Sequence, residues 1–313
     1  MAICTGAALK LVARPADSPP MATLLQAKSV SPVASLVDGM LDLVPLPQAY
    51  VRIREIVDDP GASLRAISEV VTSDPALTGR VLRLANSAYL ALASRVDSID
   101  HAVRVLGLSQ IHDIALATSA VGSLTRLRND MFDIFDFWRM SVYTAVCARH
   151  LAIGCALPAP QRLFIAGLMH NIGNLILAHQ LPQAWMECTL ASRAQDRPYH
   201  ELQRELLGFD YADVGAELLR QWNLPPALVQ PVALHTRPIA DVSGSDQPFA
   251  AAMHVAAVTA RAAVWQSTDS EPVPDYDPTA IELTSTTEET IEELMRQVDT
   301  EVAEFIAILM PNG

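Results

Sequence analysis

The chain has 313 residues, half of them hydrophobic and only 5% aromatic, and carries a formal net charge of −13. This length can bury one large core or two smaller ones, and abundant Ala and Leu with few aromatic residues favour packed helices over a β-sandwich. The acidic surface disfavours sequence-independent binding of nucleic acid. We therefore expect an all-α protein with no nucleic-acid partner.

The first half of the chain predicts a disordered segment and then a helical bundle. Residues 1–30 mix Pro, Ser and Ala without periodicity. From residue 31 to 128, capping residues and Pro or Gly stops divide the chain into short helices. The predicted helices cover residues 48–58, 63–74, 75–90, 99–107 and 110–124.

Residues 129–265 predict a second helical bundle. Its central helix, residues 162–181, is apolar nearly all round and should be buried at the centre. The most apolar part of it, residues 163–178, is too short to cross a bilayer, so we expect no membrane partner. The other predicted helices cover residues 137–156, 183–194, 198–207, 210–222, 226–235 and 248–265.

The C-terminal part predicts a linker followed by an amphipathic helix. Residues 266–285 are rich in Pro, Asp, Ser and Thr, which is typical of a linker. Thr286 with Glu289 fits a capping box at the start of a helix over 286–313, whose apolar residues recur at helical spacing. Its other face is acidic. We expect the helix to dock on its own chain, with docking on a partner as the alternative.

Cysteines and common catalytic motifs indicate no particular chemistry. Cys4, Cys147, Cys155 and Cys188 have no paired spacing, so we expect reduced thiols in a cytoplasmic protein. The N-terminus lacks a clean signal-peptide core. No P-loop, dinucleotide fingerprint, nucleophile elbow or zinc-protease motif is present in the sequence.

A His-Asn pair inside the central apolar helix is the exception. The phrase AGLMHNIGNLIL (166–177) buries His170 and Asn171, and a buried polar pair needs hydrogen-bond partners. This phrase resembles the HD-superfamily signature, in which a His-Asp pair binds a divalent metal for phosphohydrolysis. Further blocks, in order, narrow the resemblance to the HDOD family over roughly residues 35–265. They are PLPQAYVRIREIVDDP, SDPALTGRVLRLANSAYL, SIDHAVRVLGLSQIHDIAL, FDFWRMS, ELLGFDYADVGAELLRQWNLPPALV and ALHT.

Several positions depart from the catalytic pattern of that superfamily. Met140 stands after FWR where the first histidine belongs, and Asn171 replaces the aspartate of the pair. The common GFDH motif reads GFDY, with Tyr211, and only His235 of a later histidine pair remains because Thr236 follows it. The late aspartate falls near Ala257.

The resemblance therefore implies a relic pocket that comprises His170, Asn171, Met140, Tyr211, His235 and Thr236. Hydrolytic sites need about three protein ligands, and hard cations need oxygen donors. We expect no metal, no cofactor and no enzymatic activity. Two interpretations of the pair stay open: core hydrogen bonding, with Tyr211 as a candidate partner, or a pocket for a small ligand or a partner's side chain. Asp136, Arg139, Asp210 and Asp213 are candidates to line such a pocket or to cap helices.

The function that the resemblance implies is regulatory. Proteins of this family act in bacterial signalling, so we expect this chain to bind other signalling proteins in networks linked to cyclic dinucleotides, chemotaxis or motility. Two alternatives remain: a divergent metal-dependent phosphohydrolase, and a sensor with a small nucleotide as ligand. A second copy of the chain, in a homodimer, stays open as a partner.

Overall fold

The computed structural model describes residues 31–46, 48–59, 61, 63–87, 95–124, 133–265 and 272–309. Every regular element within these ranges is helical, which confirms the all-α prediction. The expected disordered segment 1–30, the boundary at 128–129 and Cys4 lie outside the described residues, whereas Cys147, Cys155 and Cys188 are free thiols. None of the described helices combines the length and apolar character that a membrane crossing requires.

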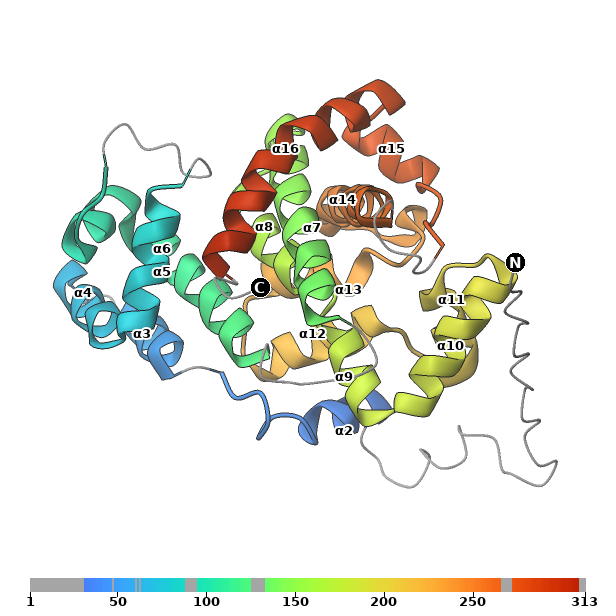
Figure 1. The fold of residues 1–313 in the computed structure, drawn as a ribbon, viewed down its shortest axis with the longest axis horizontal. Coiled ribbons are helices and arrows are strands. Elements are labelled where there is room, and N and C mark those ends of the chain that lie inside the picture. The colour runs from blue at the N-terminus through green and yellow to red at the C-terminus, as the bar shows by residue number, and fades with distance from the viewer. Residues whose placement is uncertain are drawn as a thin grey trace, which may run out of the picture.

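An N-terminal bundle forms one lobe of the molecule (Figure 1). It consists of α3 (Gln48–Asp58), α4 (Leu64–Ser73), α5 (Pro75–Ala85) and α6 (Ile99–Leu124). The predicted caps at Ser63 and Asp74 both accept backbone N–H groups. Gly107 has a φ of 77° inside α6, so the two helices predicted on either side of it meet at a kink there.

The third predicted helix of this bundle ends earlier than expected. The sequence predicted a helix over 75–90, but α5 stops at Ala85. The Asn86 side chain bonds the backbone of Val96 through both its oxygen and its nitrogen, and its nitrogen also donates to Leu82 O. The competing side-chain hydrogen bonds account for the stop at this position. Residues 88–90 lie outside the described part of the chain.

A second, larger group of helices forms the other lobe (Figure 1). It consists of α7 (Ile134–Gly154), α8 (Pro160–Met169), α9 (Ile172–Gln180), α10 (Pro182–Gln195), α11 (Tyr199–Leu207), α12 (Tyr211–Gln221), α13 (Pro226–Leu234) and α14 (Gln247–Trp265), with the short 3₁₀ turns η1 (Ile239–Asp241) and η2 (Gly244–Asp246). The early helix α2 (Pro32–Asp38) packs on α9 and α12 of this group. The sequence predicted no helix here and assigned these residues to the N-terminal bundle.

The central apolar helix is broken, which corrects the prediction of one helix over 162–181. The chain turns at His170 and Asn171, between α8 and α9. On α9, a Cβ built on Gly173 would lie 1.9 Å from the Tyr211 carbonyl oxygen. The backbones of α9 and α12 therefore meet at a contact that only glycine allows. The break places His170 at the end of α8, directed into the second bundle.

The C-terminal segment also differs from its prediction. A short helix, α15 (Pro278–Thr284), lies within the expected linker and is capped by Asp277. The last helix, α16 (Glu288–Leu309), is capped by a reciprocal Thr287–Thr290 pair, not by Thr286 and Glu289. Thr286 is buried and its hydroxyl bonds that of Thr284, so it cannot serve as the cap.

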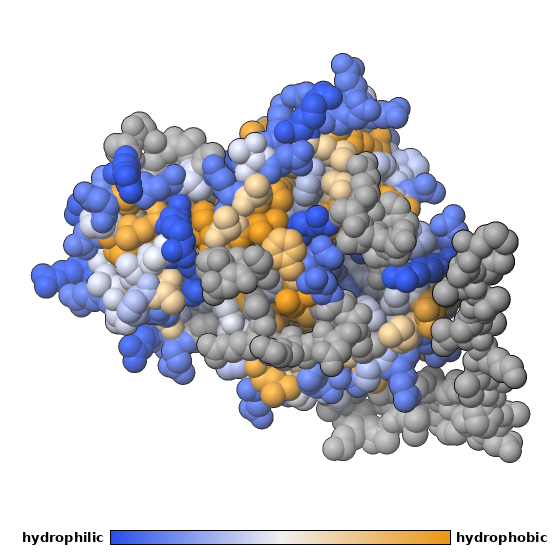
Figure 2. Space-filling model, viewed as in Figure 1, coloured by the Kyte–Doolittle hydropathy of each residue, from blue (hydrophilic) through white to orange (hydrophobic). Residues whose placement is uncertain are grey.

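Helix α16 docks on the same chain, as expected. It packs mainly on α7 and extends to α5 and α6, so it spans both lobes. Tyr143 donates to Asp299, and His150 and Arg149 pair with Glu301. One continuous hydrophobic core runs from α2 to α16. Figure 2 shows hydrophilic side chains over the outer edges of this face and hydrophobic ones toward its middle, between the lobes and along α16.

Candidate functional site

A cavity in the second lobe contains most of the predicted site residues. It encloses about 450 Å³, its open mouth included. Four residues of the predicted relic pocket line it, and so does Ala257. The lining described residues are His170, Pro198, Tyr199, His200, Tyr211, His235, Thr236, His254, Ala257, Val258, Arg261, Pro272 and Pro274.

Two predicted pocket residues, Met140 and Asn171, do not line this cavity. Met140 is half-buried on α7 and packs against the main hydrophobic core. Asn171 is buried, and its side-chain oxygen accepts from the Asn174 amide, which also bonds the Tyr199 hydroxyl. Asn171 thus belongs to a hydrogen-bond cluster beneath the cavity. Of the two interpretations left open by the sequence, Asn171 therefore fits the first, a hydrogen-bonding residue of the core.

His170 is held as a neutral imidazole. Its side chain is buried, and its Nδ1–H donates to the Gly167 carbonyl at 2.7 Å. Burial, together with the neighbouring His235, lowers the pKa of His170 to about 3. The two imidazole rings meet edge to face with centroids 5.4 Å apart. Its Nε2 is the nitrogen that carries the lone pair.

His235 has hydrogen-bond partners on both ring nitrogens. Its Nδ1–H donates to the Val232 carbonyl at 2.7 Å, and its Nε2 accepts from the Tyr211 hydroxyl at 2.9 Å. Burial lowers the pKa of His235 to about 4, so the ring is neutral near pH 7. The polar partner of Tyr211 is thus His235, whereas the sequence had suggested the His170–Asn171 pair.

Thr236 and Asp210 form a second hydrogen-bonded group beside the cavity. The Asp210 carboxylate is fully buried; one oxygen caps α12, and the other accepts from the Thr236 hydroxyl at 2.9 Å. Arg204 donates to both Thr236 and Asp210. Burial opposes ionisation of Asp210, but Arg204 and the hydrogen bonds hold its pKa below the usual value. Asp210 is therefore a capping residue that fastens α12 to the end of α13.

The other charged candidates lie away from the cavity. Asp136 and Arg139 pair with each other along α7. Asp213 pairs with Arg237 and completes the capping box of α12 by accepting from the Asp210 N–H. None of these three side chains lines the cavity. Of the two roles that the sequence left open for Asp213, the structure shows capping.

Sequence reasoning missed His200, His254 and Arg261. His254 donates from Nδ1 to the His235 carbonyl and accepts the Asp277 N–H at Nε2, each at 2.9 Å, and so ties the segment before α15 to the cavity. Burial, next to Arg204, lowers the pKa of His200 to about 3. The Arg261 guanidinium lies 5.3 Å from the Tyr199 ring centroid. Of these three residues, only His254 could have been found from the sequence. It lies three residues before Ala257, near which the late aspartate of the superfamily falls.

Comparison with known proteins places the chain in a family. The sequence profile of the HDOD domain matches residues 43–238. The chain belongs to the HDOD family. A curated relative, an uncharacterised protein of Treponema pallidum, is 25% identical over 216 residues, which are 67% of this chain and 41% of that protein. This HDOD chain thus spans about two fifths of the length of that relative.

Solved structures agree with the HDOD fold. A proposed phosphohydrolase of Shewanella amazonensis superposes with a TM-score of 0.68 at 26% identity, covering 88% of this chain and 98% of its own. An HDOD domain protein of unknown function from Geobacter sulfurreducens gives 0.66 at 18% identity, with 88% and 96% coverage. A proposed signal transduction protein of Marinobacter aquaeolei gives 0.64 at 22%, with 87% and 60% coverage.

The residues of this HDOD protein do not fit a hydrolytic metal centre. Within the described part of the chain, no three His, Cys, Asp or Glu side chains lie close enough together to hold a metal ion. His235 has partners on both nitrogens, and the Asp210 oxygens serve Arg204, Thr236 and two backbone N–H groups. The Nε2 of His170 and the neutral ring of His200 remain as nitrogen donors on the cavity wall, and two nitrogens without a carboxylate do not make a hydrolytic site.

Proposed function

We propose that this HDOD protein is a non-catalytic regulator that works in bacterial signalling by binding other signalling proteins in the cytoplasm. The observation that carries the proposal is the hydrogen bond from Tyr211 to His235 Nε2. It occupies the lone pair that a metal would need, at a position where the common family motif has a second histidine. The site's polar atoms thus stabilise the fold.

The chemistry of a hydrolase supports the same conclusion. Phosphoester hydrolysis at an HD-type site requires a metal to activate water and to stabilise charge on the phosphoryl group. The neutral histidines and the engaged Asp210 do not supply a ligand set for a metal, and a pKa of about 3 makes His170 a weak base. The helical surface is then the part of the molecule left to carry a signal, in networks of cyclic-dinucleotide, chemotaxis or motility control.

Turnover assays test the proposal. The purified protein is incubated with bis-p-nitrophenyl phosphate, nucleoside triphosphates and cyclic dinucleotides, each with Mg²⁺, Mn²⁺ or Fe²⁺. We expect rates equal to those of the His170→Ala variant. The exposed His179→Ala variant is the matched control. Metal-dependent hydrolysis that His170→Ala abolishes and His179→Ala retains would make the protein an enzyme and overturn the proposal.

A separate experiment tests the other half of the proposal, the binding of other signalling proteins. Proximity labelling at native expression level in the source bacterium should mark the same signalling proteins for the wild type and for His235→Gln. Their direct binding is then measured with the purified proteins. Failure to find a protein that binds the purified wild type would contradict this half.

A second candidate function, sensing of a small nucleotide, is favoured by one feature of the cavity. The rings of Tyr199 and Tyr211 stack at 5.2 Å, and Arg261 lies over the first of them. Aromatic faces and an arginine are groups that hold bases and phosphates. Thermal unfolding across a panel of mono- and dinucleotides separates this candidate from a pure adaptor, since a ligand of the folded state raises the melting temperature.

A further inference from the structure

A groove open to solvent runs over the N-terminal bundle, between α4 and the first turns of α6. It holds about 790 Å³ of space. The buried side chains of Ser68 and Val103 lie at its bottom, and Leu64, which is 45% exposed, lies at its edge. Figure 1 shows α4 at the end of this lobe that faces away from the second lobe. A side chain of another molecule therefore has both room and access here.

Each rim of the groove carries one cation and one anion, four residues apart. On α4, Arg65 and Glu69 form an ion pair with each other at 3.0 Å. On α6, Asp100 and Arg104 are both exposed, and neither has an ion-pair partner within the part of the chain that the structure describes. The rim on α6 thus leaves one anion and one cation for a partner to bind.

The charge order on α6 is complementary to itself. Two residues four apart lie on the same side of a helix, about 6 Å apart along its axis. A two-fold axis across this rim lays α6 of a second copy antiparallel to the first, so that the anion of each copy meets the cation of the other. The same face of the same protein is therefore a partner of matching charge.

The distribution of charge along the chain also favours a second copy at this lobe. Residues 48–124 contain seven arginines and eight carboxylates, a net charge of −1, whereas the whole chain carries −13. The remaining residues therefore carry −12. Two copies that met through the second lobe or through α16 would bring like charges together, which opposes association. Two N-terminal bundles can meet with little such repulsion.

We propose that the groove between α4 and α6 is the contact surface of a symmetric homodimer. Asp100 of each copy pairs with Arg104 of the other. The exposed Leu64 of each copy enters the groove of the other and packs over Ser68 and Val103. This interface goes beyond the regulatory role proposed above, and it leaves the second lobe and α16 of both copies accessible to other proteins.

Sedimentation equilibrium of the purified full chain tests the proposal. At low salt and concentrations up to about 500 μM, the wild type should dimerise with a Kd of roughly 1–100 μM, as expected of a small interface held by exposed ion pairs. Asp100→Arg and Arg104→Asp each place like charges opposite each other and should raise the Kd at least tenfold. Glu292→Arg, an exposed change on α16 with the same change of net charge as Asp100→Arg, is the matched control and should not alter it.

Charge exchange makes the test specific to this interface. The double variant Asp100→Arg/Arg104→Asp restores opposite charges across the two-fold axis and should dimerise like the wild type. A mixture of the two single variants should form a heterodimer, because one copy then presents two cations on α6 and the other two anions.

A variant outside the charged pair keeps the proposal falsifiable if either reversal fails to fold. Leu64→Lys places a charge over Val103 of the second copy and should also raise the Kd at least tenfold. A wild type that stays monomeric at about 500 μM, or a dimer that survives Leu64→Lys and both charge reversals, would overturn the proposal.

Discussion

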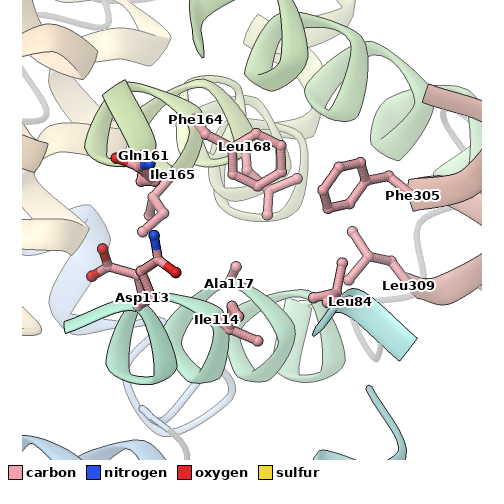
Figure 3. Close-up of a pocket in the computed structure, with 11 residues that line it drawn as sticks. Leu84, Asp113, Ile114, Ala117, Gln161, Phe164, Ile165, Leu168, Phe305 and Leu309 are labelled. Atoms are coloured by element: carbon pink, nitrogen blue, oxygen red, sulfur yellow. The ribbon is translucent and has the colours of Figure 1, made fainter. Parts of the chain in front are cut away.

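The cavity around His235 and the seam cavity, which is the gap between the lobes where α6 faces α8 beside α16, are lined by different kinds of side chain (Figure 3). Around His235, Tyr211 bonds the histidine, and Arg204 bonds Asp210 and Thr236. At the seam the wall is nearly all apolar, with the polar groups at one end. The first cavity thus has most of its polar groups bonded to one another, whereas the second is lined chiefly by apolar side chains.

The backbone packing differs in the same way. Inside the second lobe, Gly173 and Gly167 allow helices to approach so closely that a Cβ would lie 1.9 Å from Tyr211 O and 2.6 Å from Ala145 Cα, respectively. At the seam, α6 and α8 are separated by side chains that leave a cavity. We therefore expect substitutions near His235 to be costly and substitutions at the seam to be tolerated.

The largest effect is expected at the contact between α9 and α12. Gly173→Ala puts a Cβ against the backbone of Tyr211, where no side chain can yield, and should lower the free energy of unfolding by at least about 3 kcal/mol. Gly122→Ala is the matched control, since nothing lies within 4 Å of its Cβ, and it should be neutral or stabilising by up to about 1 kcal/mol. Urea unfolding measures both. Equal stability of the two variants would mean that the helices are not in contact there.

The buried histidines predict a pH dependence of stability. The pKa of His170 is lowered from 6.5 to about 3, so below pH 6.5 the unfolded chain takes up a proton that the folded chain refuses. Stability therefore falls as the pH drops from 6.5 toward 4. His170→Gln should remove roughly 2 kcal/mol of the loss between pH 6.5 and 5, whereas His179→Gln should leave the slope unchanged. Urea titrations at four pH values decide, and an unaltered slope in His170→Gln would contradict burial of the neutral ring.

The hydrogen bond between Tyr211 and His235 predicts a smaller effect. Tyr211→Phe leaves the buried Nε2 of His235 without its donor and should cost about 1–3 kcal/mol of unfolding free energy. In a His235→Gln background the same change should cost less, because the two side chains are coupled. Equal costs in both backgrounds, measured by urea unfolding, would show that the bond does not contribute.

The smallest effect is expected at α16, which spans the seam. The hydrogen bond from His150 lowers the pKa of Glu301, and so does the charge of Arg149, although burial opposes the shift. A lowered carboxyl pKa stabilises the fold near neutral pH, and that contribution is lost as the pH falls through the folded-state pKa. Glu301→Gln should cost about 0.5–1 kcal/mol at pH 7 and speed amide exchange in α16, whereas the exposed Glu293→Gln should change neither. Unchanged exchange in Glu301→Gln would mean that apolar packing alone docks α16.

Local signals predicted much of this fold because the caps and stops are local. Ser63, Asp74 and Gly107 act where their sequence positions indicate. The break at His170–Asn171 has no such signal, since the apolar pattern runs through it, and the approach of Tyr211 to Gly173 comes from another helix. The early end of α5 depends likewise on Val96, ten residues beyond Asn86.

The candidate site could be predicted in part for the same reason. The family motifs singled out His170, Tyr211, His235 and Thr236, and these four line one cavity. Met140 and Asn171 do not line it, because a motif position does not say which way a side chain points from its helix. His200 and Arg261 reach the cavity through tertiary packing alone, and the seam cavity has no sequence motif at all.

The metal content of the purified, untagged protein tests the central claim most directly. The protein is produced with ample iron, manganese and zinc, and bound metal is measured by mass spectrometry. An engaged His235, and the lack of a cluster of three ligands among the described residues, predict far less than one equivalent of metal, unchanged in the His170→Ala and His235→Ala variants. One or two equivalents in the wild type, lost in both variants, would contradict the account and make the hydrolase the leading function.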